Sequence, residues 1–160
     1  NMALPIGWGQ TISQPQVVAF MLELLGPEKG EKILDVGFGS GWQTALLACV
    51  VGDAGEVVAI ERLPEVFDFG KSNLEKYGFK NTVLIRGDGT EKIRPAGYFD
   101  KIIAAASGEN LPEAFKAELG TGGKAVMPIR ESIFVFKKTG SGRFEEKEFP
   151  GFLFVPLVRD

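Results

Sequence analysis

Short apolar runs alternate with longer amphipathic stretches along most of this chain. The short runs predict strands over Lys32–Val36, Glu56–Glu61, Thr82–Arg86, Phe99–Ala105 and Lys124–Ile129. The stretches with helical spacing predict helices over Ser13–Leu25, Gln43–Val51, Glu65–Tyr77 and Pro112–Glu118. Parallel strands joined through helices need right-handed crossovers, so this order predicts a parallel sheet covered on both faces.

The last third of the chain has a different pattern. Ser132–Lys138 and Phe144–Phe149 flank a Thr-Gly-Ser-Gly turn, which predicts an antiparallel hairpin at one edge of the sheet, and the apolar segment Phe152–Val158 ends the chain. We therefore expect a Rossmann-like, doubly wound α/β fold with a mostly parallel sheet and an antiparallel edge hairpin. Because no linker or repeat interrupts the pattern, we expect a single domain over residues 1–160.

Two predicted helices begin with the same polar signature. Ser13 and Gln16 form an S-x-x-Q capping box, in which the serine side chain caps the helix, and Ser40 and Gln43 form a second. Within the second helix, the apolar surroundings of Cys49 predict a buried, inert side chain.

Composition excludes several classes of function. The 18 basic and 21 acidic residues give a net charge of −3, which predicts no nucleic-acid partner. The chain has no histidine and one cysteine, which excludes Ser-His-Asp and Cys-His catalysis, histidine metal sites, an internal disulfide and a cysteine zinc cage. The longest apolar run, seven residues over Ala45–Val51, predicts no membrane span. With no signal-peptide pattern, we expect a cytoplasmic protein.

A glycine-rich loop, Asp35-Val36-Gly37-Phe38-Gly39-Ser40-Gly41, joins the first predicted parallel strand to its helix. Open α/β sheets bind ligands beside such loops. A dinucleotide would need a small residue where Trp42 stands, and its pyrophosphate would lie near the Asp35 carboxylate with no basic residue in the loop. S-adenosylmethionine carries an ammonium and a sulfonium and no phosphate, so an acidic loop favours that cofactor, with Asp35, Gly37, Gly39, Ser40 and Gly41 as its contacts.

Acidic residues also follow the next two predicted strands. Glu61 stands where a carboxylate can accept the ribose hydroxyls, although a solvated surface glutamate gives the same pattern. Asp88 can accept the adenine amino group while Gly89 lets the backbone approach the ring, although an ordinary Asp-Gly turn is the alternative.

These residues resemble the protein-L-isoaspartate O-methyltransferase family over Leu4 to Leu157. The resemblance is carried by the string Leu4-Pro5-Ile6-Gly7-Trp8-Gly9-Gln10-Thr11-Ile12-Ser13-Gln14-Pro15, the Asp35–Gly41 loop, Gly87-Asp88-Gly89 and Phe154-Val155-Pro156-Leu157. It implies methyl transfer from S-adenosylmethionine to the free carboxylate of isoaspartyl residues in damaged proteins. It also implies that Ser13 is the active-site residue, with Gln10 and Thr11 beside it as cofactor contacts. Ser13 as a simple helix cap remains the alternative.

The match predicts a family member shortened at its N-terminus, because relatives carry a helical segment before the Leu4 string. Phe38 and Trp42 are bulkier than is usual for the family, so we expect them to narrow the cofactor pocket. Trp8 either forms a wall of the acceptor pocket or packs against neighbouring residues. Two other hypotheses stay open: a catalytically silent domain that binds S-adenosylmethionine or a partner protein, and a nicotinamide-dependent oxidoreductase. Isoaspartyl peptides are the partners that the resemblance implies, and the sequence leaves the oligomeric state unknown.

Overall fold

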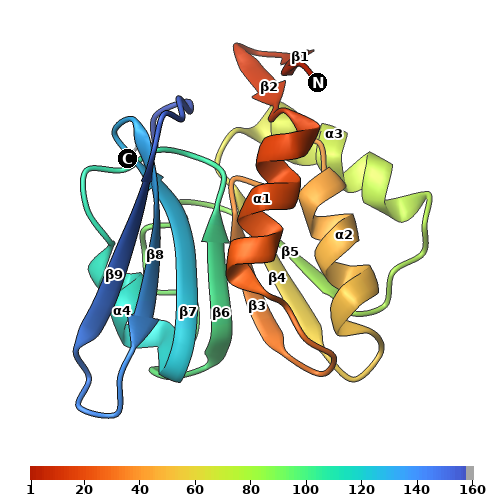
Figure 1. Cartoon of the computed structure of the whole chain (residues 1–160). Coiled ribbons are helices and arrows are strands. Elements are labelled where there is room, and N and C mark those ends of the chain that lie inside the picture. The colour runs from red at the N-terminus through yellow and green to blue at the C-terminus, as the bar shows by residue number, and fades with distance from the viewer. Residues whose placement is uncertain (158–160) are drawn as a thin grey trace.

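A single seven-stranded sheet organises the computed structural model, which describes residues 1–157 (Figure 1). Its strands in spatial order are β5 (Thr82–Arg86), β4 (Glu56–Glu61), β3 (Lys32–Val36), β6 (Phe99–Ala104), β7 (Leu119–Ile129), β8 (Ser132–Lys138) and β9 (Phe144–Pro150). The first five in this order pair in parallel, and β7, β8 and β9 pair antiparallel. The predicted Rossmann-like sheet with an antiparallel edge hairpin is confirmed.

The strand order reverses next to β3. The chain proceeds from β3 outward through β4 to β5 and then returns to place β6 on the other side of β3. The connections above β3 and β6 therefore run in opposite directions, which opens a crevice at the carboxyl ends of these strands. In α/β proteins this is the usual position of the ligand site.

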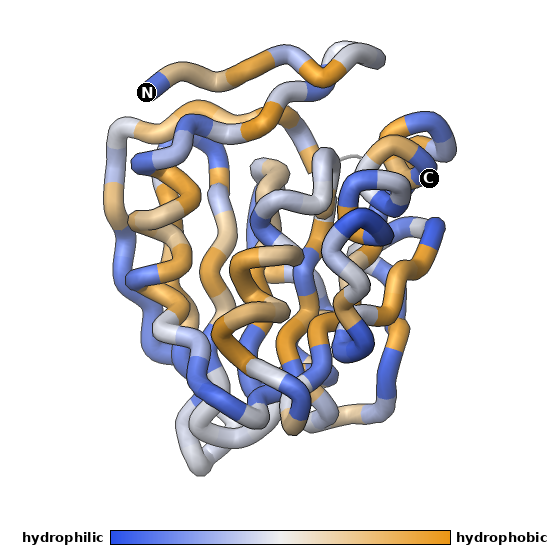
Figure 2. Tube along the Cα trace, turned by 90° about the vertical axis from the view of Figure 1, so that its right-hand side faces the viewer, coloured by the Kyte–Doolittle hydropathy of each residue, from blue (hydrophilic) through white to orange (hydrophobic). Residues whose placement is uncertain are grey.

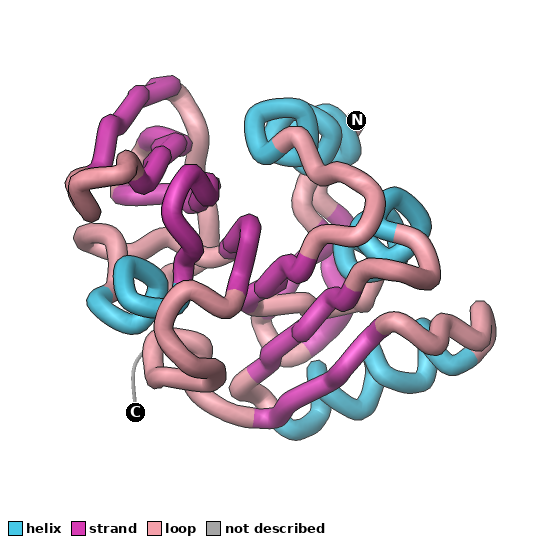
Figure 3. Tube along the Cα trace, turned by 90° about the horizontal axis from the view of Figure 1, so that it is seen from below, coloured by secondary structure: helices cyan, strands magenta, loops and turns pink. Residues whose placement is uncertain are grey.

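Helices cover both faces of the sheet. Figure 3 shows α1 (Pro15–Leu25), α2 (Trp42–Val51) and α3 (Pro64–Glu75) on one side and α4 (Glu113–Glu118) on the other. Alternate side chains of each inner strand enter the two cores: in β3, Ile33 joins the cluster with α1 and α2, whereas Leu34 joins the cluster with α4. Burial on both faces explains why these strands are near-continuous apolar runs in the sequence.

Neither predicted capping box forms. Helix α1 begins at Pro15, with Gln14 at the N-cap and no side-chain cap, because a proline at the first helical position keeps the residue before it extended. Helix α2 has Gly41 at its N-cap in the left-handed conformation. Ser40 Oγ accepts only a long, 3.4 Å hydrogen bond from the Trp42 N–H.

A short N-terminal hairpin was not predicted. Strands β1 (Leu4–Gly7) and β2 (Gln10–Ile12) pair antiparallel around Trp8 and Gly9, whose φ angles of 52° and 71° are both positive. Two positive φ angles are the mark of a tight hairpin turn, and a two-residue turn ending in glycine between short apolar segments is the signal that could have revealed it. The hairpin crosses the top of the molecule in Figure 2.

Two further expectations, those on β7 and Cys49, need correction. Strand β7 begins at Leu119 rather than Lys124, because the glycines between them are part of the strand instead of a turn. Cys49 is exposed, since α2 is apolar on nearly every side and its sequence does not mark the buried face. The end segment is outside the sheet, with one isolated bridge from Pro156 to Ser107, and its last predicted residue, Val158, lies beyond the described residues. Over residues 1–157, no helix reaches the length and apolarity of a membrane span.

Candidate functional site

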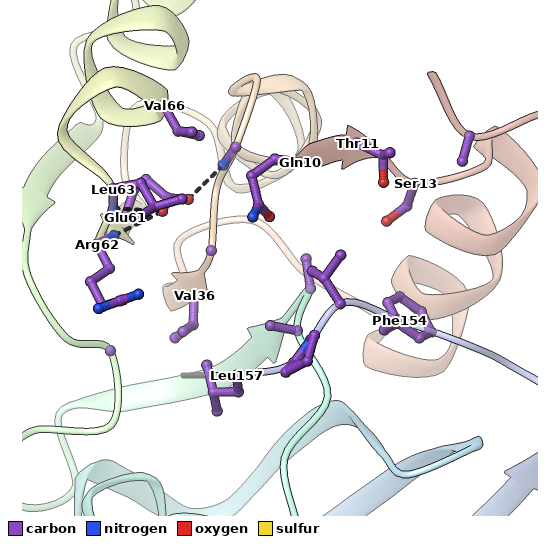
Figure 4. Close-up of a pocket in the computed structure, with 18 of the residues that line it drawn as sticks. Gln10, Thr11, Ser13, Val36, Glu61, Arg62, Leu63, Val66, Phe154 and Leu157 are labelled. Carbon is purple, nitrogen blue, oxygen red and sulfur yellow. Dashed lines mark hydrogen bonds between the residues drawn. The ribbon is translucent and has the colours of Figure 1, made fainter. Parts of the chain in front are cut away.

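A cavity of about 680 Å³ lies at the crevice above β3 and β6. Figure 4 shows side chains from three directions around it: Gln10, Thr11 and Ser13 from the N-terminal segment, Glu61 and Arg62 from the end of β4, and Phe154 and Leu157 from the end of the chain. Because segments distant in sequence meet here, the cavity forms only once the chain has folded.

Most residues predicted for the site line this cavity. Eight of them do so: Gln10, Thr11, Ser13, Gly37, Gly39, Glu61, Asp88 and Gly89. The structure thus brings the three loops after β3, β4 and β5 to the same space as the N-terminal segment. The other three predicted residues, Asp35, Ser40 and Gly41, do not line it.

Asp35 supports the site from below instead of facing the cavity. Its side chain is completely buried, and its two oxygens accept hydrogen bonds from Gln43 Nε2 at 2.8 Å and Thr44 Oγ1 at 2.7 Å. Burial raises the pKa of this carboxyl to about 6; the two hydrogen bonds oppose the rise, and the negative charge of Glu61 adds to it. We therefore correct the expected cofactor contact: Asp35 ties the end of β3 to the first turn of α2.

The glycine loop needs its glycines for conformation and for space. Gly37, Gly39 and Gly41 have φ angles of 76°, 53° and 82°, a region that other residues rarely adopt. Gly41 also lies against α3, where an added Cβ would come within 2.8 Å of Leu74 Cγ. Gly41 thus shapes the loop, and Ser40 is held through its carbonyl oxygen, which accepts a 3.1 Å hydrogen bond from Asn73 Nδ2.

The Glu61 carboxylate is fixed at the cavity wall by backbone groups. Its Oε1 accepts the N–H groups of Arg62 and Leu63 at 2.9 and 3.1 Å, and its Oε2 accepts the Gly39 N–H at 3.2 Å. Glu61 is buried, so it is not the solvated surface glutamate that the sequence left open. A carboxylate oxygen can accept two hydrogen bonds, which leaves Oε2 able to accept one from a ligand hydroxyl.

The third loop places Asp88 and Gly89 on the same wall. Asp88 Oδ1 accepts the Thr90 N–H at 2.7 Å, which holds the turn closed. At Gly89, an added Cβ would come within 2.4 Å of Val36 Cγ1 and 3.1 Å of Ile60 Cγ2. Only glycine lets this backbone pack directly on the ends of β3 and β4, so the pair does more than form a turn.

Polar groups without partners mark the opposite side of the cavity. In the described part of the chain, the side chains of Gln10, Thr11 and Ser13 make no hydrogen bond. Figure 4 shows the Thr11 and Ser13 hydroxyls on the N-terminal segment, where both residues line the cavity. Since Ser13 does not cap α1, its hydroxyl is available to a ligand in the cavity.

The bulky aromatic residues leave the cavity open. Phe38 is buried and packs on Phe67 of α3 at 5.6 Å between ring centroids, and neither Phe38 nor Trp42 lines the cavity. The expected narrowing is therefore wrong, because the loop directs the Phe38 ring toward α3. The Trp8 ring packs on the Phe69 ring at 6.2 Å between centroids and is half exposed. Trp8 therefore packs on α3 and does not form a wall of the cavity.

Several lining residues were not predicted. Arg62 follows Glu61 directly, and Ala105 and Ala106 follow β6, at strand ends where the fold itself would have indicated them. The segment from Gly151 to Leu157 also lines the cavity. Its apolar composition suggested only packing, so no chemical signal distinguished it. Within residues 1–157, no cluster of carboxylate or thiol side chains is suited to a metal ion.

Comparison with known proteins agrees with this arrangement. The sequence profile described as protein-L-isoaspartate(D-aspartate) O-methyltransferase (PCMT) matches residues 1–160. The chain belongs to this family. Proteins named protein-L-isoaspartate O-methyltransferase from Methanopyrus kandleri and Aeropyrum pernix are 41% and 43% identical to it, each over 97% of the chain. The chain covers 71% of the first relative and 62% of the second.

Solved structures of the family share the fold. A protein-L-isoaspartate O-methyltransferase superposes with a TM-score of 0.88 at 27% identity; the match covers 99% of this chain and 53% of that one. A Plasmodium falciparum protein assigned to the same enzyme class, solved with S-adenosyl-L-homocysteine, superposes with a TM-score of 0.86 at 24% identity, over 99% of this chain and 80% of that one. The chain thus spans about half the length of the first structure.

Proposed function

We propose that this chain transfers a methyl group from S-adenosylmethionine to the free carboxylate of L-isoaspartyl residues in damaged proteins. The observation that carries the proposal is one cavity with two chemically different walls. The wall with Glu61 and Asp88 suits an adenosyl group, and the wall with Thr11 and Ser13 offers unpaired hydroxyls to an acceptor. Family membership supports this pairing of cofactor and acceptor.

The residues around the cavity fit S-adenosylmethionine. The loop after β3 has no basic side chain for a phosphate, and the fixed Glu61 carboxylate can accept a ribose hydroxyl. Asp88 and the close-packed Gly89 backbone suit the adenine ring, while Gly37 and Gly39 let the backbone approach the rest of the cofactor. Trp42 stands where the dinucleotide fingerprint needs a small residue, which argues against a nicotinamide dinucleotide.

Catalysis then depends on position rather than on a base. S-adenosylmethionine, when bound, supplies an activated methyl group. The acceptor is a carboxylate whose ordinary pKa is about 4, so it is ionised at neutral pH and needs no histidine to remove a proton. The Ser13 and Thr11 hydroxyls would hold this anion by hydrogen bonds and orient one oxygen toward the methyl group. Orientation of this kind lowers a barrier by roughly 7 to 11 kcal/mol.

The test compares two synthetic peptides that differ only in the linkage at one residue, L-isoaspartyl or normal L-aspartyl. Incubation with S-adenosylmethionine and mass spectrometry should show one methyl ester on the isoaspartyl peptide and none on the aspartyl peptide. Ser13→Ala should reduce kcat/KM by about ten-fold or more, because a hydrogen bond to a charged group contributes about 1.5 to 3 kcal/mol. Its fold is expected to persist, because Ser13 caps no helix.

Turnover of neither peptide, together with tight binding of S-adenosylhomocysteine, would support the silent-domain hypothesis instead. The predicted cytoplasmic location, the lack of a nucleic-acid partner and the single domain over residues 1–160 stay predictions.

A further inference from the structure

The acceptor side of the cavity is built from two uncharged stretches of chain. Residues 1–22 contain no Asp, Glu, Lys or Arg, and neither do residues 149–157, although charged residues make up 24% of the sequence. The charged side chains that line the cavity are Glu61, Arg62 and Asp88, and all three belong to the loops on the opposite wall. The described residues of these two stretches therefore offer an acceptor no charged side chain of their own.

These two stretches, which we call the rim, also expose large apolar side chains. Of the six most exposed large apolar residues in the described chain, four belong to the uncharged stretches: Met2, Leu4, Trp8 and Leu153. Leu153 is 82% exposed and lines the cavity directly. Figure 2 shows the N-terminal segment across the top of the molecule with hydrophobic positions along it. The apolar residues from Phe152 to Leu157 all line the cavity, and an apolar surface of this kind beside a site is typical of an interaction surface.

We propose that this apolar rim binds the residues that flank the isoaspartyl site and selects acceptors with apolar neighbours. The inference rests on the proposed function, because an isoaspartyl carboxylate that reaches Ser13 must bring its neighbouring residues over the rim. A charged neighbour would lose water there without gaining a partner, whereas an apolar neighbour would bury surface against Leu153. The chain thus favours isoaspartyl sites from the interior of unfolded proteins, where apolar neighbours are common.

The test uses two isoaspartyl peptides of equal length and net charge, one with leucine on both sides of the isoaspartyl residue and one with glutamate and lysine there. We expect kcat/KM to be about ten-fold higher for the leucine peptide, a ratio that one partly buried apolar side chain can supply. Leu153→Ser should reduce this ratio several-fold. Tyr77→Ser is the matched control, since Tyr77 is 72% exposed and does not line the cavity, and it should leave the ratio unchanged.

Equal kcat/KM for the two peptides, or an unchanged ratio in Leu153→Ser, would overturn the inference. If neither peptide is methylated, the proposed function fails. Fluorescence polarisation then tests the rim separately: the labelled leucine peptide should bind about ten-fold more tightly than the labelled glutamate and lysine peptide. Analytical ultracentrifugation completes the experiment: a dimer that Leu153→Ser dissociates would assign the rim to a second copy of the chain and overturn the proposed occupant.

Discussion

Asp35 is the residue whose environment most clearly ties local chemistry to stability. Its pKa is raised from 3.8 to about 6, mainly because burial removes the charged carboxylate from water. Between these two pH values the folded protein holds a proton that the unfolded chain has released. Stability from this group is therefore greatest at low pH and falls as pH rises, by about 3 kcal/mol once pH exceeds 6.

Asp35→Asn should remove this dependence, because asparagine cannot ionise and its amide can exchange hydrogen bonds with Gln43 and Thr44. Urea unfolding at pH 4, 5, 6 and 7 measures the effect. The unfolding free energy of the variant minus that of the unsubstituted chain should rise by about 3 kcal/mol from pH 4 to pH 7. Parallel pH profiles for the two proteins would show that Asp35 is not the titrating group.

Arg130 occupies a conformation that suits glycine better. It lies in the two-residue turn between β7 and β8 with a φ of 54°, which costs an L-residue about 1 to 2 kcal/mol. Arg130→Gly should raise the unfolding free energy by about 0.5 to 1 kcal/mol, after the greater freedom of glycine in the unfolded chain is subtracted. Thermal or urea unfolding measures it.

The neighbouring turn residue provides the control for Arg130. Glu131 is not among the residues with positive φ, so Glu131→Gly should lower stability. A gain from both substitutions would indicate that the charge of the turn, rather than its backbone, limits stability.

At the residue scale, the sequence predicted which polar side chains stand at the ends of strands. It did not predict the direction in which each of these side chains points. Glu61 and Asp88 both line the cavity because a parallel sheet brings the carboxyl ends of its strands together. Asp35 has the same chemistry, yet it turns away from the cavity because Gln43 and Thr44 lie within hydrogen-bond reach below the loop. Such competition between partners appears only once the helix is in place.

At the scale of elements, the packing of α3 on the glycine loop is the least tolerant contact. Gly70 lies so close to the loop that an added Cβ would come within 2.2 Å of the Gly39 carbonyl oxygen and 2.5 Å of the Phe38 ring. The carbonyl is backbone and cannot rotate away. Any side chain at position 70 must therefore shift the loop that lines the cavity.

Gly70→Ala should consequently weaken binding of S-adenosylhomocysteine by about ten-fold and lower stability by about 1 to 3 kcal/mol, as overpacked contacts do. Ser72→Ala on the exposed side of α3 is the control and should change neither quantity appreciably. Isothermal titration calorimetry and urea unfolding measure the two effects. Unchanged affinity in Gly70→Ala would show that the loop adapts.

The elements themselves were largely predictable where burial sets a strong pattern. The bounds of β3, β4, β5 and β8 agree with the predicted ranges, because each is a buried or half-buried apolar run bounded by turn residues. The β1–β2 hairpin was missed because its strands are only four and three residues long and are mostly exposed or half-buried, so they carry no buried apolar run. The helix starts were wrong because Pro15 and Gly41 set the backbone more strongly than the serine caps.

At the scale of the whole molecule, the strand reversal beside β3 brings the two walls of the cavity together. The wall proposed to bind the cofactor comes from the loops after β3, β4 and β5, and the wall proposed to bind the acceptor comes from the two ends of the described chain. The sequence predicted the first wall from the fold. The N-terminal part of the second wall was predicted only through the family resemblance. The segment from Gly151 to Leu157 was identified as part of this wall only from the structure.

The cofactor wall is the feature on which the proposed activity depends. Calorimetric titration of S-adenosylhomocysteine into the chain, Glu61→Gln and the control Glu65→Gln tests it most directly, because Glu65 is an exposed carboxylate on α3 close in sequence. We predict that one ligand binds per chain. The affinity of Glu61→Gln should be at least ten-fold lower, because a charged hydrogen-bond acceptor worth about 1.5 to 3 kcal/mol is lost. The control should bind with unchanged affinity. No binding to the unsubstituted chain, or equal affinity in Glu61→Gln, would contradict the account.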